Sequence, residues 1–266
     1  LVGNLNEVAR ALIDAVNELA TPRALERRTA ERRAACTAHT AQVRAARLES
    51  SRRVGGGPVP WQRLMYELNR QLEPDAVVVE ELGTELKTLG HFPFADDAKM
   101  KIGRTEGRSL GWGVGASAGV KLALPDRQVV SLQGDGGFLF GQTDSLWTMS
   151  RYDIPVMTVV TNNRSYEETR WQIFNRAGRA GLANRDYVSY LGDPDVDFSR
   201  LASAYNIPGA VVSHSDELES AIAEGLRTLR EGRPFMLDVR TRTLGAGAEL
   251  SWYPDYSVAD NRTRNV

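Results

Sequence analysis

The sequence contains a single cysteine and no long apolar run. One cysteine, Cys36, excludes an internal disulfide framework and is typical of a protein kept in a reducing cytoplasm. No apolar stretch reaches the roughly 20 residues that a membrane-spanning helix requires. With 33 basic and 34 acidic side chains the formal net charge is −1, so the strong charge of one sign that attracts nucleic acids or membrane surfaces is missing.

Histidine is also scarce. His39, His91 and His214 show no spacing typical of metal ligands and have no cysteine cluster beside them, so a metal site built on imidazole or thiolate is not expected. The chain lacks an initiator methionine and a signal peptide ahead of Leu1, and it begins within a helical pattern. We therefore expect a fragment, or a processed piece, of a longer polypeptide.

Three segments are predicted along the chain. Apolar residues recur at helical spacing in the first 20 residues, and residues 23–53 are rich in alanine and arginine, which indicates a long solvated helix. Glutamates alternate with these arginines, which argues against a nucleic-acid patch. We assign residues 1–57 to the end of a preceding domain plus a helical linker, residues 58–240 to the main domain, and residues 241–266 to a tail that folds back as a lid.

The main domain is organised around two apolar runs. Val129–Leu132 ends in Gly134–Gly137, a helical segment follows, and Val156–Val160 ends in Asn162-Asn163. Two short β-branched runs joined by one helix predict a βαβ unit with parallel strands, and hence an α/β fold with a three-layer parallel sheet and helices on both faces. Because parallel strands end on one edge of the sheet, Asp135 should lie beside Asn163, 28 residues further on.

The residue types at this edge predict a particular chemistry. The Asp135 carboxylate, the Asn163 amide oxygen and a nearby backbone carbonyl form an all-oxygen half-shell that suits Mg²⁺ or Ca²⁺, with phosphate oxygens and water completing it. Gly134, Gly136 and Gly137 allow the backbone to approach an anion, and the following helix directs its amino end at it. The pattern therefore predicts a metal-bridged diphosphate. The alternative is a glycine turn and a polar loop without a ligand.

This pattern resembles the signature of thiamine diphosphate (ThDP)-dependent enzymes of the acetolactate synthase and benzoylformate decarboxylase superfamily: Gly-Asp-Gly, about 27 intervening residues, and then asparagine. Gly134-Asp135-Gly136 and Asn162-Asn163 carry the resemblance. It implies ThDP and Mg²⁺ as cofactors, with Asp135, Asn163 and the backbone carbonyl of Ser165 as metal ligands. Gly134, Gly136 and Gly137 would then contact the diphosphate.

A second glycine-rich stretch spans residues 103–119. It superficially fits a dinucleotide fingerprint, but a true fingerprint follows a strand directly, so a nicotinamide site is not expected. The stretch resembles instead the ThDP-enzyme segment that cradles the aminopyrimidine ring, a loop leading into a small-residue helix over 116–124. By that match Leu110 bends the cofactor into its V shape, and a backbone carbonyl near Arg108 accepts a bond from the 4′-amino group. A plain core position remains the alternative for Leu110.

The resemblance also implies a contact from the loop after the strand predicted at Ala76–Val79. In the family this loop supplies hydroxyl and amide contacts to the diphosphate, and Thr84 is the residue placed for them. A helix N-cap is an equally simple role for Thr84, and the two roles are compatible.

Residues that follow Asn163 are expected to face the substrate. Their Tyr…Arg-Trp pattern resembles the benzoylformate decarboxylase type, in which this helix reaches over the thiazolium ring, so Tyr166 is expected to bind the cofactor. Thr169 and Gln172 are spaced i and i+3 and would face the substrate together. Glu167 or Glu168 would transfer protons if desolvated beside the cofactor. An acidic pair that merely stabilises a helix start is the alternative.

The resemblance implies a ThDP- and Mg²⁺-dependent carbon–carbon lyase or carboligase. Its substrate would be a 2-oxoacid, as in decarboxylases and acetolactate synthases, or a 2-hydroxyacyl-CoA thioester. A non-catalytic ThDP-fold subunit or binding module is the alternative, and the presence of Asp135 and Asn163 argues against it. In the family a glutamate on a separate domain contacts the pyrimidine ring, and no segment here matches that domain. We expect it from another chain or a missing amino-terminal region, in a cytoplasmic homodimer or homotetramer with no nucleic-acid or membrane partner.

Overall fold

The computed structural model of the chain describes residues 3–82, 88, 90–94, 99–103, 109–141, 143–170, 172, 189–192 and 194–242. Two of the residues predicted to bind the cofactor, Thr84 and Arg108, lie outside these ranges, and so does the tail from residue 243 onward. The chain divides into two units, Leu1–Glu49 and Ser50–Val266.

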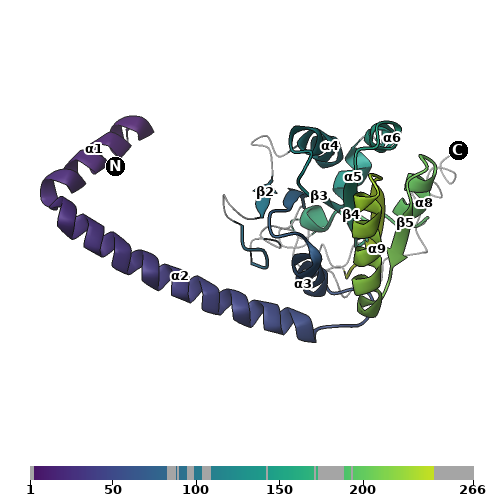
Figure 1. The fold of residues 1–266 in the computed structure, drawn as a ribbon, viewed down its shortest axis with the longest axis horizontal. Helices are drawn as coiled ribbons and strands as arrows, with labels where there is room; N and C mark the ends of the chain where they lie inside the picture. Colours follow the sequence, from purple (N-terminus) through teal and green to yellow (C-terminus); the bar gives the residue numbers. More distant parts are fainter. Residues whose placement is uncertain are drawn as a thin grey trace, which may run out of the picture. The chain divides into compact units, whose positions relative to one another are not determined.

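The first unit is helical. α1 spans Leu5–Leu19, and α2 spans Pro22–Arg53 and continues into the second unit (Figure 1). The long solvated helix predicted over 23–53 is therefore confirmed, and Ser51 is the one residue of α2 that is buried. None of the helices in the described ranges combines the length and the apolar character that a bilayer crossing requires.

The second unit is built on a six-stranded parallel sheet with the strand order β2-β1-β3-β4-β6-β5. Its strands are β1 (Val77–Glu81), β2 (Met100–Ile102), β3 (Val129–Gly134), β4 (Val156–Asn162), β5 (Gly209–Val212) and β6 (Phe235–Arg240). The central strands β1, β3 and β4 are buried almost throughout, as expected where helices cover both faces of a parallel sheet. The predicted α/β fold is confirmed.

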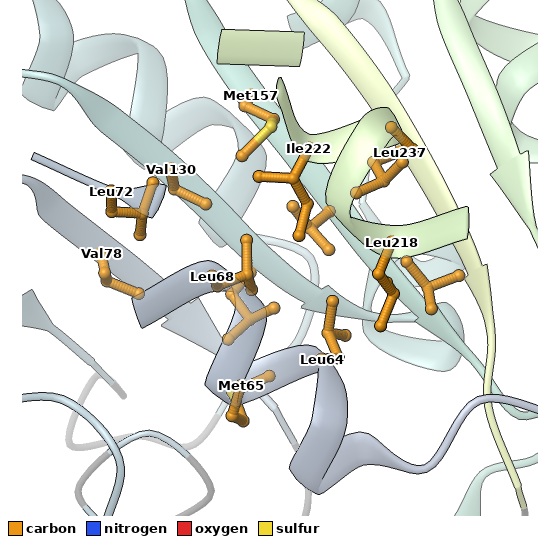
Figure 2. Packing of buried hydrophobic residues seen from close by; sticks show 14 of the residues in the cluster. Leu64, Met65, Leu68, Leu72, Val78, Val130, Met157, Leu218, Ile222 and Leu237 are labelled. Carbon is orange, nitrogen blue, oxygen red and sulfur yellow. The ribbon is translucent and has the colours of Figure 1, made fainter. Parts of the chain in front are cut away.

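Helices pack on both faces of this sheet. α3 (Trp61–Gln71) and α9 (Leu218–Arg230) cover one face, where their leucines and isoleucine meet Val78, Val130 and Met157 in a continuous apolar layer (Figure 2). α4 (Gly113–Ala123), α6 (Asp144–Arg151) and α8 (Phe198–Ser203) contribute to the apolar layer on the other face. Burying each such side chain contributes about 1.5–3 kcal/mol, so these two layers hold the sheet in place.

The connection between β3 and β4 differs from the prediction. One helix was expected between the strands, but the structure has two: α5 (Asp135–Phe140) ends at Phe140, and α6 begins at Asp144. The strands β2 and β5 were not predicted either: both are short strands at the two edges of the sheet, and neither is fully buried.

Strand register fixes which residues meet at the carboxyl edge of the sheet. Glu81 pairs with Gln133 across β1 and β3, and Gly134 pairs with Thr161 across β3 and β4. The three central strands therefore end side by side. The polar residues that follow them are brought to one place, as expected for the ligand-binding edge of a parallel α/β sheet.

Candidate active site

A cavity of about 280 Å³ opens at this carboxyl edge. Every predicted site residue that the structure describes lines it: Leu110, Gly134, Asp135, Gly136, Gly137, Asn163, Ser165, Tyr166, Glu167, Glu168, Thr169 and Gln172. Four separate segments of the chain thus converge on one cavity: the end of β1, the loop before α4, the β3–α5 junction and the chain after β4.

Asp135 directly follows β3 and is buried. It is 4% exposed, its Oδ1 accepts a hydrogen bond from Gly136 N–H (2.8 Å), and its Oδ2 accepts one from Ser165 N–H (3.2 Å). Burial raises the pKa of Asp135 to about 7, although these N–H donors oppose the rise, and the negative charge of Glu167 adds to it. Because burial makes the ionised form of Asp135 unfavourable, a cation bound beside it would stabilise the carboxylate.

Asn163 follows the last residue of β4 and faces Asp135. Its Oδ1 accepts a hydrogen bond from the same Ser165 N–H at 3.0 Å. The carboxylate oxygen and the amide oxygen therefore converge on one backbone donor. Arg164 lies between Asn163 and Ser165 in the chain and has a left-handed backbone (φ 58°). This conformation turns the chain so that the Ser165 N–H points back at both oxygens.

The Ser165 carbonyl, predicted as the third metal ligand, accepts a hydrogen bond from Glu167 N–H (2.8 Å). A carbonyl oxygen has two lone pairs, so one remains for a cation. Among the described residues no group of three or more His, Cys, Asp or Glu side chains could hold a metal ion. The donor set is instead one carboxylate, one amide and one carbonyl, which fits a hard cation whose remaining ligands are supplied by a bound anion and water.

The glycines at the end of β3 and in the first turn of α5 have different surroundings. A Cβ on Gly136 would lie 2.4 Å from the Tyr166 ring, and a Cβ on Gly137 would lie 3.2 Å from Glu81 Oε1, whereas Gly134 has more open space. Gly136 therefore makes room for Tyr166, which is a second reason for glycine besides the approach of an anion. Burial, and the charge of Asp135, raise the pKa of the Tyr166 hydroxyl.

Glu81 was not predicted as a site residue. It ends β1, is 4% exposed and lines the cavity, and its two carboxylate oxygens accept hydrogen bonds from Gly111 N–H and Gly113 N–H (2.6 Å for the second). Glu81 thereby fixes the start of α4 and the residues just before it. The signal in the sequence was an acidic residue at the end of a buried strand, directly before a loop assigned to the site.

Leu110 belongs to the segment that Glu81 holds. Its side chain is 45% exposed and lines the cavity, so the core alternative for this residue is wrong. The next residue, Gly111, has φ +86°, and a Cβ there would come within 2.7 Å of the backbone of Phe140 and Gly141. A glycine is required at this turn, and the turn leaves Leu110 facing the cavity.

The four residues predicted to take part in catalysis, Glu167, Glu168, Thr169 and Gln172, lie after Asn163, where residues 167–170 are helical. Glu167 is 9% exposed, and its Oε2 accepts a hydrogen bond from Asn163 Nδ2 (3.1 Å). Glu168 is half-buried, and Thr169 and Gln172 are exposed at the cavity wall. The geometry thus offers two carboxylates and two neutral polar groups beside the cation-binding oxygens.

Comparison with known proteins agrees with this arrangement. Residues 102–239, just over half of the chain, match the family model of the thiamine pyrophosphate enzyme, C-terminal TPP binding domain. The chain is 33% identical over 180 residues to the acetolactate synthase isozyme 3 large subunit of Escherichia coli (67% of this chain, 30% of that protein). It is 31% identical over 135 residues to benzoylformate decarboxylase of Pseudomonas aeruginosa (51% of this chain, 24% of that protein).

A solved structure gives the same result. The thiamine diphosphate-dependent 4-hydroxybenzoylformate decarboxylase of Rhodococcus jostii superposes with a TM-score of 0.59 at 26% identity, covering 71% of this chain and 33% of that one. The chain spans about a third of the length of these relatives, or less. Its sheet, its cavity and its matched residues identify the chain as a member of the thiamine pyrophosphate enzyme family, whose C-terminal TPP-binding domain it contains.

Proposed function

We propose that this chain is the diphosphate-binding part of a ThDP- and Mg²⁺-dependent enzyme that breaks or forms a carbon–carbon bond next to the carbonyl of a 2-oxoacid. One observation carries the proposal: Asp135 Oδ2 and Asn163 Oδ1 converge on one N–H, that of Ser165, inside the cavity at the carboxyl edge. Two hard oxygens held this close suit a small dication that bridges to a diphosphate.

Each part of the cofactor has a proposed holder. Mg²⁺ would bind the side-chain oxygens of Asp135 and Asn163 and the backbone carbonyl of Ser165. The glycines after β3 would lie against the diphosphate, with Thr84 as a further contact. Leu110 would support the bent cofactor and Tyr166 would pack beside it, while a carbonyl near Arg108 would accept the amino group of the pyrimidine.

Bound ThDP would supply a nucleophilic carbon and an electron sink for the carbon–carbon bond. The protein's own groups would orient the substrate and move protons. Thr169 and Gln172, exposed at the cavity wall, would hydrogen-bond the substrate. Glu168, half-buried in the same wall, would deliver or remove a proton near the reacting carbon, as would Glu167 if it reaches that atom.

The relatives favour a 2-oxoacid substrate. Benzoylformate and 4-hydroxybenzoylformate are 2-oxoacids, and two of the related proteins are named as decarboxylases of these compounds. A 2-hydroxyacyl-CoA thioester stays a weaker proposal, since no described residue argues for a CoA site. A non-catalytic subunit would have no need of the buried Asp135 beside Asn163.

The remaining catalytic parts would come from elsewhere. We propose that the glutamate that activates the pyrimidine belongs to another chain or to a further segment of the same polypeptide, in a homodimer or homotetramer. The short span of this chain relative to its relatives supports that proposal.

Thermal unfolding of the chain with and without ligands tests the cofactor assignment. ThDP and Mg²⁺ added together should raise the melting temperature, and either one alone should raise it far less. No shift with both ligands at millimolar concentration would overturn the proposal. Carbon dioxide release from benzoylformate, measured once the chain is combined with its pyrimidine-binding part, would then test the reaction class.

A further inference from the structure

The Asn163 carboxamide has two chemically opposite ends, and only its oxygen can bind a cation. In the structure both ends have a hydrogen-bond partner. Oδ1 accepts from Ser165 N–H (3.0 Å), next to Asp135 Oδ2 on the same donor, while Nδ2 donates to Glu167 Oε2 (3.1 Å). A reversed amide would set a donor against Ser165 N–H and an acceptor against the Glu167 carboxylate. Reversal would therefore lose two hydrogen bonds and create two repulsions.

Glu167 is itself held in place, so its carboxylate can determine the orientation of the Asn163 amide. It is 9% exposed and lies four residues after Asn163, in the first turn of the helical segment 167–170. Its backbone N–H donates to the Ser165 carbonyl (2.8 Å), and Arg170 N–H donates to the Tyr166 carbonyl (3.0 Å). Because the turn fixes the Glu167 backbone relative to Ser165, the carboxylate reaches Asn163 without ordering a long flexible segment.

We propose that Glu167 is a positioning residue for the metal site: it holds the Asn163 carboxamide with its oxygen toward Asp135. It also places a second negative charge close to the cation. This inference rests on the proposed function, because it assumes that a divalent cation binds between Asp135 and Asn163. It differs from a proton-transfer role, since Glu167 acts here on a ligand of the metal and not on the substrate.

The test is a Mg²⁺ titration of the full chain at saturating ThDP, followed by tryptophan fluorescence, with Mn²⁺ binding measured independently by electron paramagnetic resonance. Loss of a group that orients a metal ligand typically weakens metal affinity about 10- to 100-fold, and this is expected for Glu167→Ala. Glu167→Gln keeps a carbonyl oxygen that can accept from Asn163 Nδ2, so it should recover most of the lost affinity. Unchanged affinity in Glu167→Ala would overturn the proposal.

Repeating Glu167→Ala in the Asn163→Asp variant distinguishes a role in orienting the Asn163 amide from general support of the local structure. Asn163→Asp replaces the carboxamide by a group with oxygen at both ends, so no orientation is needed, and it sets two carboxylates against each other. In that background Glu167→Ala should leave Mg²⁺ affinity unchanged or strengthen it. An equal loss from Glu167→Ala in both backgrounds would contradict a role in orienting the amide. Should Glu167→Ala fail to fold without ligands, Glu167→Leu takes its place in both backgrounds, because leucine fills a similar volume and has no oxygen to accept from Asn163 Nδ2. The same results are then expected, and equal losses in both backgrounds would again contradict the proposal.

Two controls complete the experiment. Glu224→Ala removes one negative charge from an exposed position on α9 and should not change Mg²⁺ affinity. Asp135→Ala tests the assumption beneath the inference. If it leaves the Mg²⁺ requirement intact, the proposed metal site fails. If it abolishes Mg²⁺ binding while Glu167→Ala has no effect, only the positioning role fails.

Discussion

The two edges of the parallel sheet each carry a cavity, but the charges that line the two cavities differ: one lining has both signs, and the other is acidic. The amino-edge cavity, about 380 Å³, is lined by three acidic and three basic side chains. Lys121 Nζ donates to two backbone carbonyls, and Arg127 donates to the Asp75 carbonyl and lies 3.8 Å from its carboxylate. The carboxyl-edge cavity is lined by four acidic residues, and none of its described lining residues is basic.

This difference teaches that cavity size does not identify the site. At the amino edge the charges of both signs compensate one another near solvent, where ion pairs contribute little. At the carboxyl edge Asp135 is buried, with N–H donors around it and an acidic neighbour, and its pKa rises to about 7. A dication would neutralise this excess of buried negative charge, and we therefore propose the smaller cavity as the functional one.

The largest predicted effect that distinguishes the two edges is the contribution of Asp135 to the pH dependence of stability, measured without ligands. The pKa of Asp135 is about 7 in the folded chain and about 4 when unfolded. Between these values the folded state keeps a proton that the unfolded state loses. The free energy of unfolding should therefore fall by about 4 kcal/mol as pH rises from 4 to 7, and level off above 7.

Urea unfolding at a series of pH values measures this contribution, with Asp135→Asn as the comparison because it cannot ionise. The difference between the two chains isolates Asp135 from every other titrating group. A flat difference between the chain and Asp135→Asn would contradict the picture of an uncompensated buried carboxylate.

A smaller loss of stability is expected when Glu81 is changed. Glu81→Gln replaces a carboxylate that accepts two backbone N–H groups with one acceptor and one donor. Hydrogen bonds to charged groups contribute about 1.5–3 kcal/mol, so a loss near that size is expected in urea unfolding. Glu73→Gln, exposed at the amino edge, should change stability by less than about 0.5 kcal/mol. Equal effects of the two would show that Glu81 does not hold the start of α4.

A matched pair of glycine substitutions should give a loss and a small gain. Gly136→Ala would bring a methyl group within 2.4 Å of the Tyr166 ring, and forcing such a contact typically costs about 1–3 kcal/mol. Gly119→Ala, inside α4 with no atom near the added Cβ, should stabilise by up to about 1 kcal/mol. Thermal unfolding of both variants measures the difference, and equal melting temperatures would mean that Tyr166 does not pack against Gly136.

The sequence predicted the centre of the fold because its signals there are local. Each of the two apolar runs contains a single polar residue, Ser131 or Thr158, and parallel pairing alone determines that Asp135 and Asn163 end on the same edge. The edge strands β2 and β5 were missed because they are short and partly exposed: β2 has only three residues with a lysine at its centre, and the three apolar residues of β5 follow a proline and a glycine.

The site was predicted less completely than the fold because its contacts are long-range. Glu81 accepts its hydrogen bonds from backbone groups 30 and 32 residues away. No pattern of side chains in the sequence predicts which backbone N–H groups will donate to it. Gly136 was explained by an approaching anion, whereas its nearest neighbour is Tyr166. Glu167 was assigned to proton transfer or to stabilising a helix start, whereas in the structure its carboxylate accepts a hydrogen bond from Asn163, four residues away. Residue types were readable from the sequence, while the pairing of their atoms required the structure.

ThDP affinity at the two edges is the most direct measurement of the central claim. Asp135→Ala and its amino-edge control Asp126→Ala each remove one carboxylate from a cavity. ThDP binding to each variant should be measured by calorimetry with and without Mg²⁺. We expect Asp135→Ala to lose ThDP affinity by about 100-fold or more and to lose its Mg²⁺ dependence, while Asp126→Ala keeps both. Unchanged, Mg²⁺-dependent ThDP binding in Asp135→Ala would contradict the account.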